Sequence, residues 1–173
     1  MDLQLIFVVE ANKKSKSDWI YIKTTIDHFF TYDTEHIKLT PVYMGGKGKY
    51  KDREKEINKL ISQYAAQSPE RNSRVIYCFD CDEYDRKPDD KKFLDDAKDY
   101  CCQKNYEFAW FCKDIERVYL SKKIDDCKKI KEAREFKVKN KIKDVKFSTL
   151  SKQEYSNNSS NIGNVLKKYL TLK

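Results

Sequence analysis

The stretch Ser73-Arg-Val-Ile-Tyr-Cys-Phe-Asp-Cys-Asp-Glu-Tyr-Asp85 decides how the fold is interpreted. Its first half is apolar from Val75 to Phe79, which predicts a buried β-strand. Its second half places four carboxylates within six positions: Asp80, Asp82, Glu83 and Asp85. Strand alternation would put Asp80 and Asp82 on the same side of the backbone. The acids therefore form either a solvated turn or a site for a hard cation such as Mg²⁺, which proteins bind through carboxylate oxygens and water.

The composition indicates one domain with an excess of positive charge. The 173 residues include 36 Lys and Arg against 28 Asp and Glu, for a net charge of +8. This length suits a single core, and the charge favours a polyanionic partner, nucleic acid first. The longest wholly apolar run, Leu5 to Val9, is too short for a membrane span or a signal peptide. We therefore expect a cytoplasmic protein without a membrane partner, and its oligomeric state is open.

The cysteines fit a reducing compartment. Cys78-x-x-Cys81 has the spacing of a zinc or redox motif. However, Cys78 lies inside the expected strand, and the adjacent Cys101 and Cys102 cannot supply the second half of a four-thiolate site. Reduced cysteines that pack as small apolar side chains are the favoured interpretation.

Strand-like and helix-like segments alternate over residues 3–120. Apolar runs of strand type cover residues 3–9, 38–44, 75–79 and 106–112, with helical spacing between them. Ser17 or Asp18 is expected to cap the first helix. Pro41 places the second strand near a sheet edge or interrupts it, and Pro88 is expected in a first helical turn. The alternation predicts an α/β fold, a Rossmann-like, mainly parallel sheet of about four strands with helices on both faces.

The chain changes character after residue 120. Between Lys122 and Lys146 it has eleven basic and five acidic residues with few apolar ones. This pattern indicates a solvated helix that packs lightly or protrudes. A short helix is expected over residues 161–172. We divide the chain into a core, residues 1–120, and a basic, mostly helical C-terminal extension, residues 121–173, packed on the core or projecting from it.

Carboxylates stand at the ends of several expected strands. Glu10 ends the first, Asp80 and Asp82 end the third, and Glu116 follows the fourth. Ligands of parallel sheets bind beyond the carboxyl ends of the strands. These four side chains are therefore expected to converge on one edge of the sheet as a metal site, with Asp85 as a further candidate ligand.

Basic residues flank the expected site. The loop Gly45-Gly-Lys-Gly-Lys49 lacks the spacing of a Walker motif, but its glycines could present consecutive N–H groups as an anion nest. Lys47 and Lys49 in this loop, and Lys13 and Lys14 after the first strand, are the candidate phosphate contacts, together with lysines from Lys122 onward.

The ordered set of motifs resembles the Toprim domain. That family has a Glu at the end of its first strand and Asp-x-Asp after its third, and both hold metal for cleaving or joining phosphodiesters. Within it, the small RloB-like and abortive-infection proteins of phage defence are the most similar. Ala11 stands where Toprim proteins usually have Gly, and a turn with positive φ would be strained by Ala. The matching pieces are Val9-Glu10 with the loop through Asp18, Gly45 to Gly48, Phe79 to Glu83, Ala109 to Glu116, and, more weakly, Ser160 to Gly163.

Flavodoxin-like receiver domains also gather acids around Mg²⁺, but their phosphoacceptor Asp and partner Lys are not evident in this spacing. The Toprim resemblance implies a metal-dependent nuclease in phage defence. Its metal ligands would be Glu10, Asp80, Asp82 and Glu116, holding one or two Mg²⁺ or Mn²⁺ ions, and Glu10 is alternatively a general base.

The main alternative is a non-catalytic nucleic-acid-binding or partner-regulating module that works with an ATPase. A nucleotide-handling α/β enzyme is a third interpretation. Whether DNA or RNA is the substrate is open.

Two kinds of residue receive no functional assignment. His28 and His36 lie away from the expected site and are interpreted as structural or surface residues. The twelve tyrosines could stack on bases, but most occupy core spacing.

Overall fold

The structure is a computed structural model, and it describes residues 2–173. A central five-stranded sheet has the order β3–β1–β4–β5–β6. The first four of these strands run parallel to one another, whereas the two-residue β6 is antiparallel to β5. The predicted mainly parallel α/β sheet is confirmed, with one short strand more than expected. The strands are β1 (Leu3–Val9), β3 (Ile37–Tyr43), β4 (Asn72–Asp80), β5 (Glu107–Cys112) and β6 (Ser159–Ser160).

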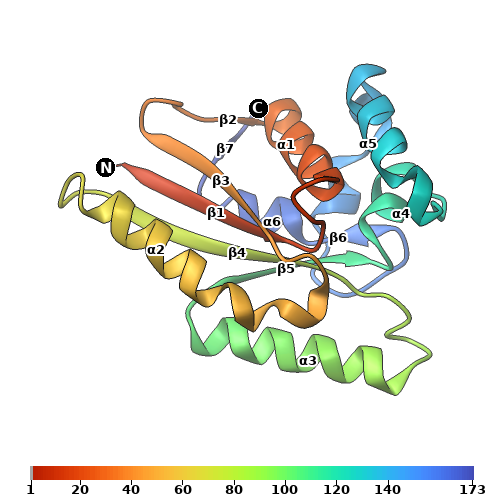
Figure 1. The fold of residues 1–173 in the computed structure, drawn as a ribbon. Helices are drawn as coiled ribbons and strands as arrows, with labels where there is room; N and C mark the ends of the chain where they lie inside the picture. The colour runs from red at the N-terminus through yellow and green to blue at the C-terminus, as the bar shows by residue number, and fades with distance from the viewer. Residues whose placement is uncertain (1) are drawn as a thin grey trace.

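Helices cover both faces of the sheet (Figure 1). One face carries α2 (Glu54–Ala65) and α3 (Pro88–Gln103). The other carries α1 (Ser17–Phe29), α4 (Ile115–Leu120), α5 (Lys129–Val138) and α6 (Ile162–Leu166). None of the helices within residues 2–173 is long and apolar enough to cross a membrane.

Side-chain alternation divides the core into two layers. Phe7 of β1 belongs to the layer under α1, and Ile6 and Val8 belong to the layer under α2 and α3. Because successive strand residues point to opposite faces, a strand buried on both sides must be apolar throughout. The same alternation separates Cys78 from Cys81, which lie in opposite layers. All six cysteines are free in the structure.

The C-terminal segment packs into the core. Phe136 of α5 and Ile142 are buried in the same cluster as β1, so the segment is packed more firmly than its sparse apolar residues indicate. Gly163 permits the close approach of α6 to the preceding loop, since a Cβ there would lie 2.5 Å from Ser151 Oγ and 2.8 Å from Leu150 O.

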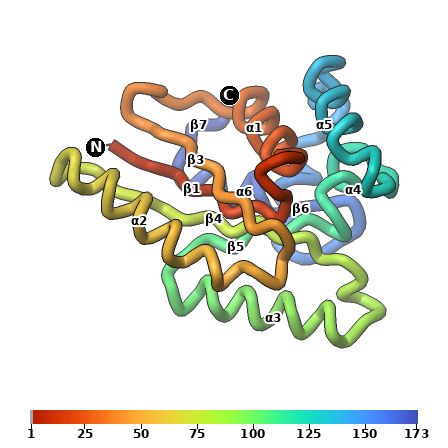
Figure 2. The backbone as a smooth tube through the Cα atoms, viewed as in Figure 1, coloured from red at the N-terminus to blue at the C-terminus, as the bar shows by residue number. Residues whose placement is uncertain are grey.

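Several predicted element boundaries agree with the structure, and two predictions are wrong. Pro41 lies in the edge strand β3, and Pro88 is the first residue of α3. Neither Ser17 nor Asp18 caps α1, which has no side-chain cap. The predicted closing helix ends at Leu166, because β7 (Thr171–Leu172) pairs with β2 (Phe30–Thr31) beside the end of α1 (Figure 2).

Candidate active site

The carboxyl ends of β1 and β4 bring Glu10 and Asp80 into contact. Glu10 Oε1 accepts a hydrogen bond of 2.8 Å from the backbone N–H of Asp80. Asp80 Oδ1 accepts one of 2.9 Å from the N–H of Ile115, the first residue of α4. Two strand ends and one helix start therefore hold this pair of carboxyl groups in place.

Asp18 is a third carboxylate at this site, and it was not assigned from the sequence. Its Oδ2 accepts a hydrogen bond of 2.9 Å from the N–H of Ala11. Glu10, Asp18 and Asp80 line one pocket of about 520 Å³, which Lys129 also lines. The sequence carries a signal for this role, because Asp18 is the first acid after Glu10. Its place at the start of the first helix favours a helix cap instead.

The glycine loop closes one side of this pocket. Gly45 and Gly46 have φ values of 69° and 122°, which glycine adopts without strain. Their N–H groups donate to Ala11 O at 3.4 Å and to Glu10 O at 3.0 Å. The predicted anion nest is therefore wrong for these two N–H groups, which bind the loop after β1. Ala11 has no positive φ, so the strain expected there does not arise.

Asp82 lies beyond the end of β4, so strand alternation does not place it beside Asp80 as predicted. β4 ends at Asp80, and Asp82 adopts a left-handed conformation with φ 49° while its N–H donates to Lys113 O at 2.7 Å. The Asp82 carboxylate pairs with Lys47. Lys47 Nζ also lies 3.6 Å from Asp90 and 4.8 Å from the centre of the Phe93 ring. Lys47 is thus engaged by protein carboxylates at the edge of the site.

Glu116 lies inside the protein behind this pocket. Its side chain is 1% exposed, and neither carboxylate oxygen has a hydrogen-bond partner among the described residues. Lys129 Nζ lies 3.8 Å from Glu116 Oε2. Burial raises the pKa of Glu116 to about 7 even though Lys129 opposes the shift. Burial alone would lower the pKa of Lys129, but Glu116 and Asp80 raise it.

The remaining predicted residues lie outside the pocket. Asp85 faces Lys113 Nζ at 3.3 Å, so the structure does not bring it to Glu10 and Asp80. Lys13, Lys14 and Lys49 are exposed. Lys13 and Lys14 belong to the loop whose neighbours Asn12 and Ser15 line the pocket, which places these two lysines near its rim.

Burial and mutual repulsion raise the pKa values of the clustered acids. The pKa of Glu10 rises to about 8, mainly through burial, with Asp18 and Asp82 adding repulsion. The pKa of Asp80 rises well above its usual range through burial and then through the charge of Glu10. Raised acid pKa values mean that nearby cations do not compensate these carboxylates, a pattern common at functional sites.

The donor chemistry of this site fits a hard cation. Carboxylate oxygens are the ligands that Mg²⁺ and Mn²⁺ prefer. Within residues 2–173, however, no three Asp, Glu, His or Cys side chains stand in an arrangement that holds a metal ion. Since Asp82 is paired with Lys47, a metal site that includes Asp82 requires this ion pair to open.

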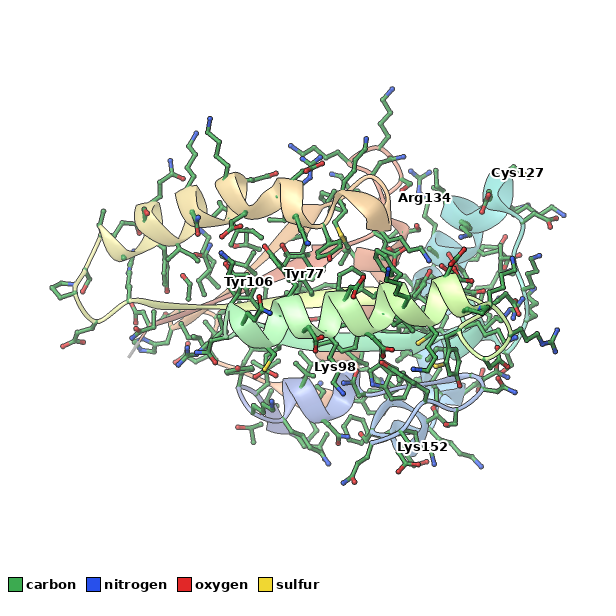
Figure 3. All side chains as sticks on the ribbon, turned by 90° about the horizontal axis from the view of Figure 1, so that it is seen from below. Tyr77, Lys98, Tyr106, Cys127, Arg134 and Lys152 are labelled. Carbon is green, nitrogen blue, oxygen red and sulfur yellow. The ribbon has the colours of Figure 1, made fainter. Side chains whose placement is uncertain are left out.

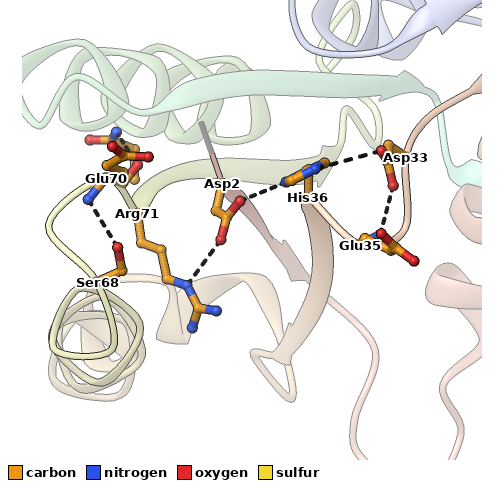
Figure 4. Close-up of polar contacts among 8 residues, drawn as sticks. Asp2, Asp33, Glu35, His36, Ser68, Glu70 and Arg71 are labelled. Carbon is orange, nitrogen blue, oxygen red and sulfur yellow. Dashed lines mark hydrogen bonds and ion pairs between the residues drawn. The ribbon is translucent and has the colours of Figure 1, made fainter.

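A separate polar cluster lies at the amino ends of the parallel strands, opposite the pocket. His36 Nδ1 lies 2.8 Å from Asp2 Oδ1, and Arg71 Nε donates to Asp2 Oδ2 at 3.2 Å (Figure 4). His28 packs edge-on against Phe29. Both histidines thus make local contacts away from the pocket.

The α/β sheet by itself does not define an activity, because this fold class supports many unrelated reactions. Comparisons with protein-family models, with curated proteins and with solved structures found no match to this chain.

Proposed function

We propose that the protein is a metal-dependent nuclease that hydrolyses phosphodiesters of DNA or RNA. The observation that carries this proposal is the pocket in which Glu10, Asp18 and Asp80 meet with raised pKa values. The carboxylates in this pocket outnumber the cationic side chains, and a hard divalent cation would balance their charge. The motif resemblance to the phage-defence Toprim proteins supports a role in abortive infection.

Glu10, Asp18 and Asp80 would hold Mg²⁺ or Mn²⁺, and Asp82 would join them on leaving Lys47. The ion would polarise the scissile phosphate and lower the pKa of bound water. Glu10, whose pKa is raised to about 8 in the metal-free protein, is alternatively the general base instead of a metal ligand, because a cation bound to it would lower that pKa. Lys47, once released by Asp82, would contact a substrate phosphate.

The test removes two carboxylates from the site. We expect Asp80→Ala with Asp82→Ala to abolish both Mn²⁺ binding in calorimetry and Mn²⁺-dependent cleavage of single-stranded DNA, duplex DNA and RNA. The matched control, Asp96→Ala with Asp99→Ala, removes two exposed carboxylates of α3 and should behave as the unmodified protein. Full activity in the first double variant would contradict the proposal. So would an unmodified protein that neither binds Mn²⁺ nor cleaves any of these substrates.

A second candidate is a non-catalytic nucleic-acid-binding or regulatory module that works beside an ATPase. The Lys47–Asp82 ion pair favours it, because this pair satisfies Asp82 without metal. Metal titration separates the two functions. A nuclease site binds Mn²⁺ through its carboxylates, whereas electrostatic binding of nucleic acid weakens with salt and is insensitive to EDTA.

A further inference from the structure

A groove runs along the outer edge of β5, between α3 and α6. Two cavities of about 550 and 520 Å³ form it. None of their lining residues lines the pocket of Glu10 and Asp80. The two cavities adjoin each other, because they share four lining residues: Lys98, Glu107, Phe108 and Lys168.

One face of α3 forms the long wall of this groove. Lys98 lines both cavities, and Cys101 and Cys102, about one turn further along, line the second. Lys98 to Cys102 span about 6 Å along the axis of α3. A third cavity of about 280 Å³ shares Tyr155 with the first and reaches Asp85. The groove therefore leads toward the acidic stretch that follows β4.

The charge of the groove suits a polyanion. Its lining has four cationic side chains against the two carboxylates Glu107 and Glu154. Glu107 is already engaged, since it accepts hydrogen bonds of 2.6 Å from Lys168 Nζ and from Tyr169 Oη. Figure 3 shows Lys98 on the side of α3 that faces α6, with Lys152 on the loop across from it. Among the described residues, these two lysines make no ion pair and are available to phosphates.

Aromatic side chains line the same groove. Phe108 of β5 and Tyr155 are partly buried and offer ring surface to the groove. Trp110 of β5 is only 4% exposed, and Tyr155 packs edge-on against it with ring centres 4.9 Å apart. Tyr106 and Tyr169 line the second cavity. Lysines beside aromatic rings are typical of sites where phosphates pair with cations while bases stack on rings.

The outer edge of β5 does not suit an added peptide strand. Asn161 Oδ1 accepts a hydrogen bond of 2.8 Å from Trp110 N, and its Nδ2 donates to Phe108 O at 2.9 Å. Strand addition would need these backbone groups to be free. The side chains, rather than the backbone, are therefore what this groove offers to a partner.

We propose that this groove binds single-stranded nucleic acid, with phosphates at Lys98 and Lys152 and bases against Phe108 and Tyr155, whose rings are only partly buried. A duplex keeps its bases stacked inside, so it cannot reach these rings in the same way. The proposal deepens the nuclease function by naming the substrate class, and it rests on that function only for what happens to the bound strand.

The experiment uses Trp110, which is buried and packs against Tyr155, as a fluorescence probe of changes at that ring. The chain has two tryptophans, so Trp19→Phe leaves Trp110 as the sole indole. We expect a short oligothymidylate in EDTA to quench Trp110 fluorescence, and a duplex of equal length to bind about tenfold more weakly or worse. Lys98→Glu with Lys152→Glu should weaken oligothymidylate binding by about tenfold or more. The matched control, Lys59→Glu with Lys92→Glu, changes the same charge on exposed residues outside the groove and should stay within about twofold.

The proposal would be contradicted if the two double variants lost oligothymidylate affinity equally. It would also be contradicted by equal affinity for the duplex, or by unchanged Trp110 fluorescence on addition of oligothymidylate. Far-UV circular dichroism checks folding, and Lys98→Gln with Lys152→Gln provides a milder second variant. Oligothymidylate binding without Mn²⁺ binding would support the proposed groove and contradict the nuclease function. Mn²⁺ binding without an oligothymidylate response would contradict the proposed groove and leave the metal site supported.

Discussion

β1 has a carboxylate at each end, and the two meet opposite surroundings. Asp2 precedes the strand and contacts His36 and Arg71, and the hydrogen bond from His36 is the main reason that its pKa is lowered. Glu10 follows the strand, and burial raises its pKa to about 8. Two acids eight residues apart thus have pKa shifts of opposite sign.

The difference lies in what each carboxylate faces. Asp2 stands in an exposed cluster whose charges are balanced, a kind of contact that contributes little to stability. Glu10 stands among Asp18 and Asp80, where the carboxylates outnumber the nearby cations. Uncompensated buried charge costs stability, and its retention at one end of the strand is a pattern common at functional sites.

The largest effect on stability is expected on removing the cation of Lys129, which lies beside the buried Glu116. Lys129→Met leaves Glu116 buried without its neighbouring charge. Breaking a buried ion pair costs about 3–5 kcal/mol, but the Lys129 side chain is 32% exposed, so we expect a loss of about 1–3 kcal/mol in urea denaturation. Lys128→Met is the matched control, since Lys128 pairs with exposed Asp125, and it should change stability by less than about 0.5 kcal/mol. If both variants lost the same free energy of unfolding, the Lys129–Glu116 pair would be no more important to stability than a surface ion pair.

A smaller effect of opposite sign is expected at the two ends of β1. Glu10→Gln removes one of the clustered charges and keeps an oxygen that can accept from Asp80 N. Without metal at pH 8, it should raise the free energy of unfolding by about 1–2 kcal/mol. Asp2→Asn instead removes a partner of His36 and Arg71 and should slightly lower it. Denaturation of the two variants side by side tests this, and a destabilised Glu10→Gln variant would show that Glu10 is already compensated.

The smallest effect is a pH dependence of the metal-free protein. The pKa of Glu10 is raised from 4.5 to about 8, and that of Glu116 from 4.5 to about 7. Between each ordinary pKa and its raised value, the folded chain therefore binds more protons than the unfolded chain. Stability must then fall as pH rises from about 5 to 8. In EDTA we expect the Tm to drop by at least about 2–4 °C, which corresponds to about 1 kcal/mol.

His36 needs a control in this pH experiment. The hydrogen bond to Asp2 raises the pKa of His36, so its contribution is also lost as pH rises. The decline should persist in His36→Asn. If the decline in Tm disappears in this variant, it arises from the Asp2–His36 contact and not from Glu10. A Tm that rises toward pH 8 would contradict the charge imbalance at Glu10.

The sequence by itself determined the α/β class and the positions of strand ends. Continuous apolar runs in β1 and β4 specify strands buried on both faces, and Glu10 and Asp80 follow directly from where those runs end. Parallel alignment then brings the two acids to one edge. These inferences use only local periodicity and chain order.

The tertiary structure alone decided which side chains face one another. Asp82 turns to Lys47 because β4 ends before it, and Asp18 enters the pocket through a bond to Ala11 rather than as a cap. The groove of Lys98 and Lys152 joins segments far apart in the chain. Periodicity specifies the face that a residue occupies within its own element, whereas its partners depend on long-range packing that no local pattern encodes.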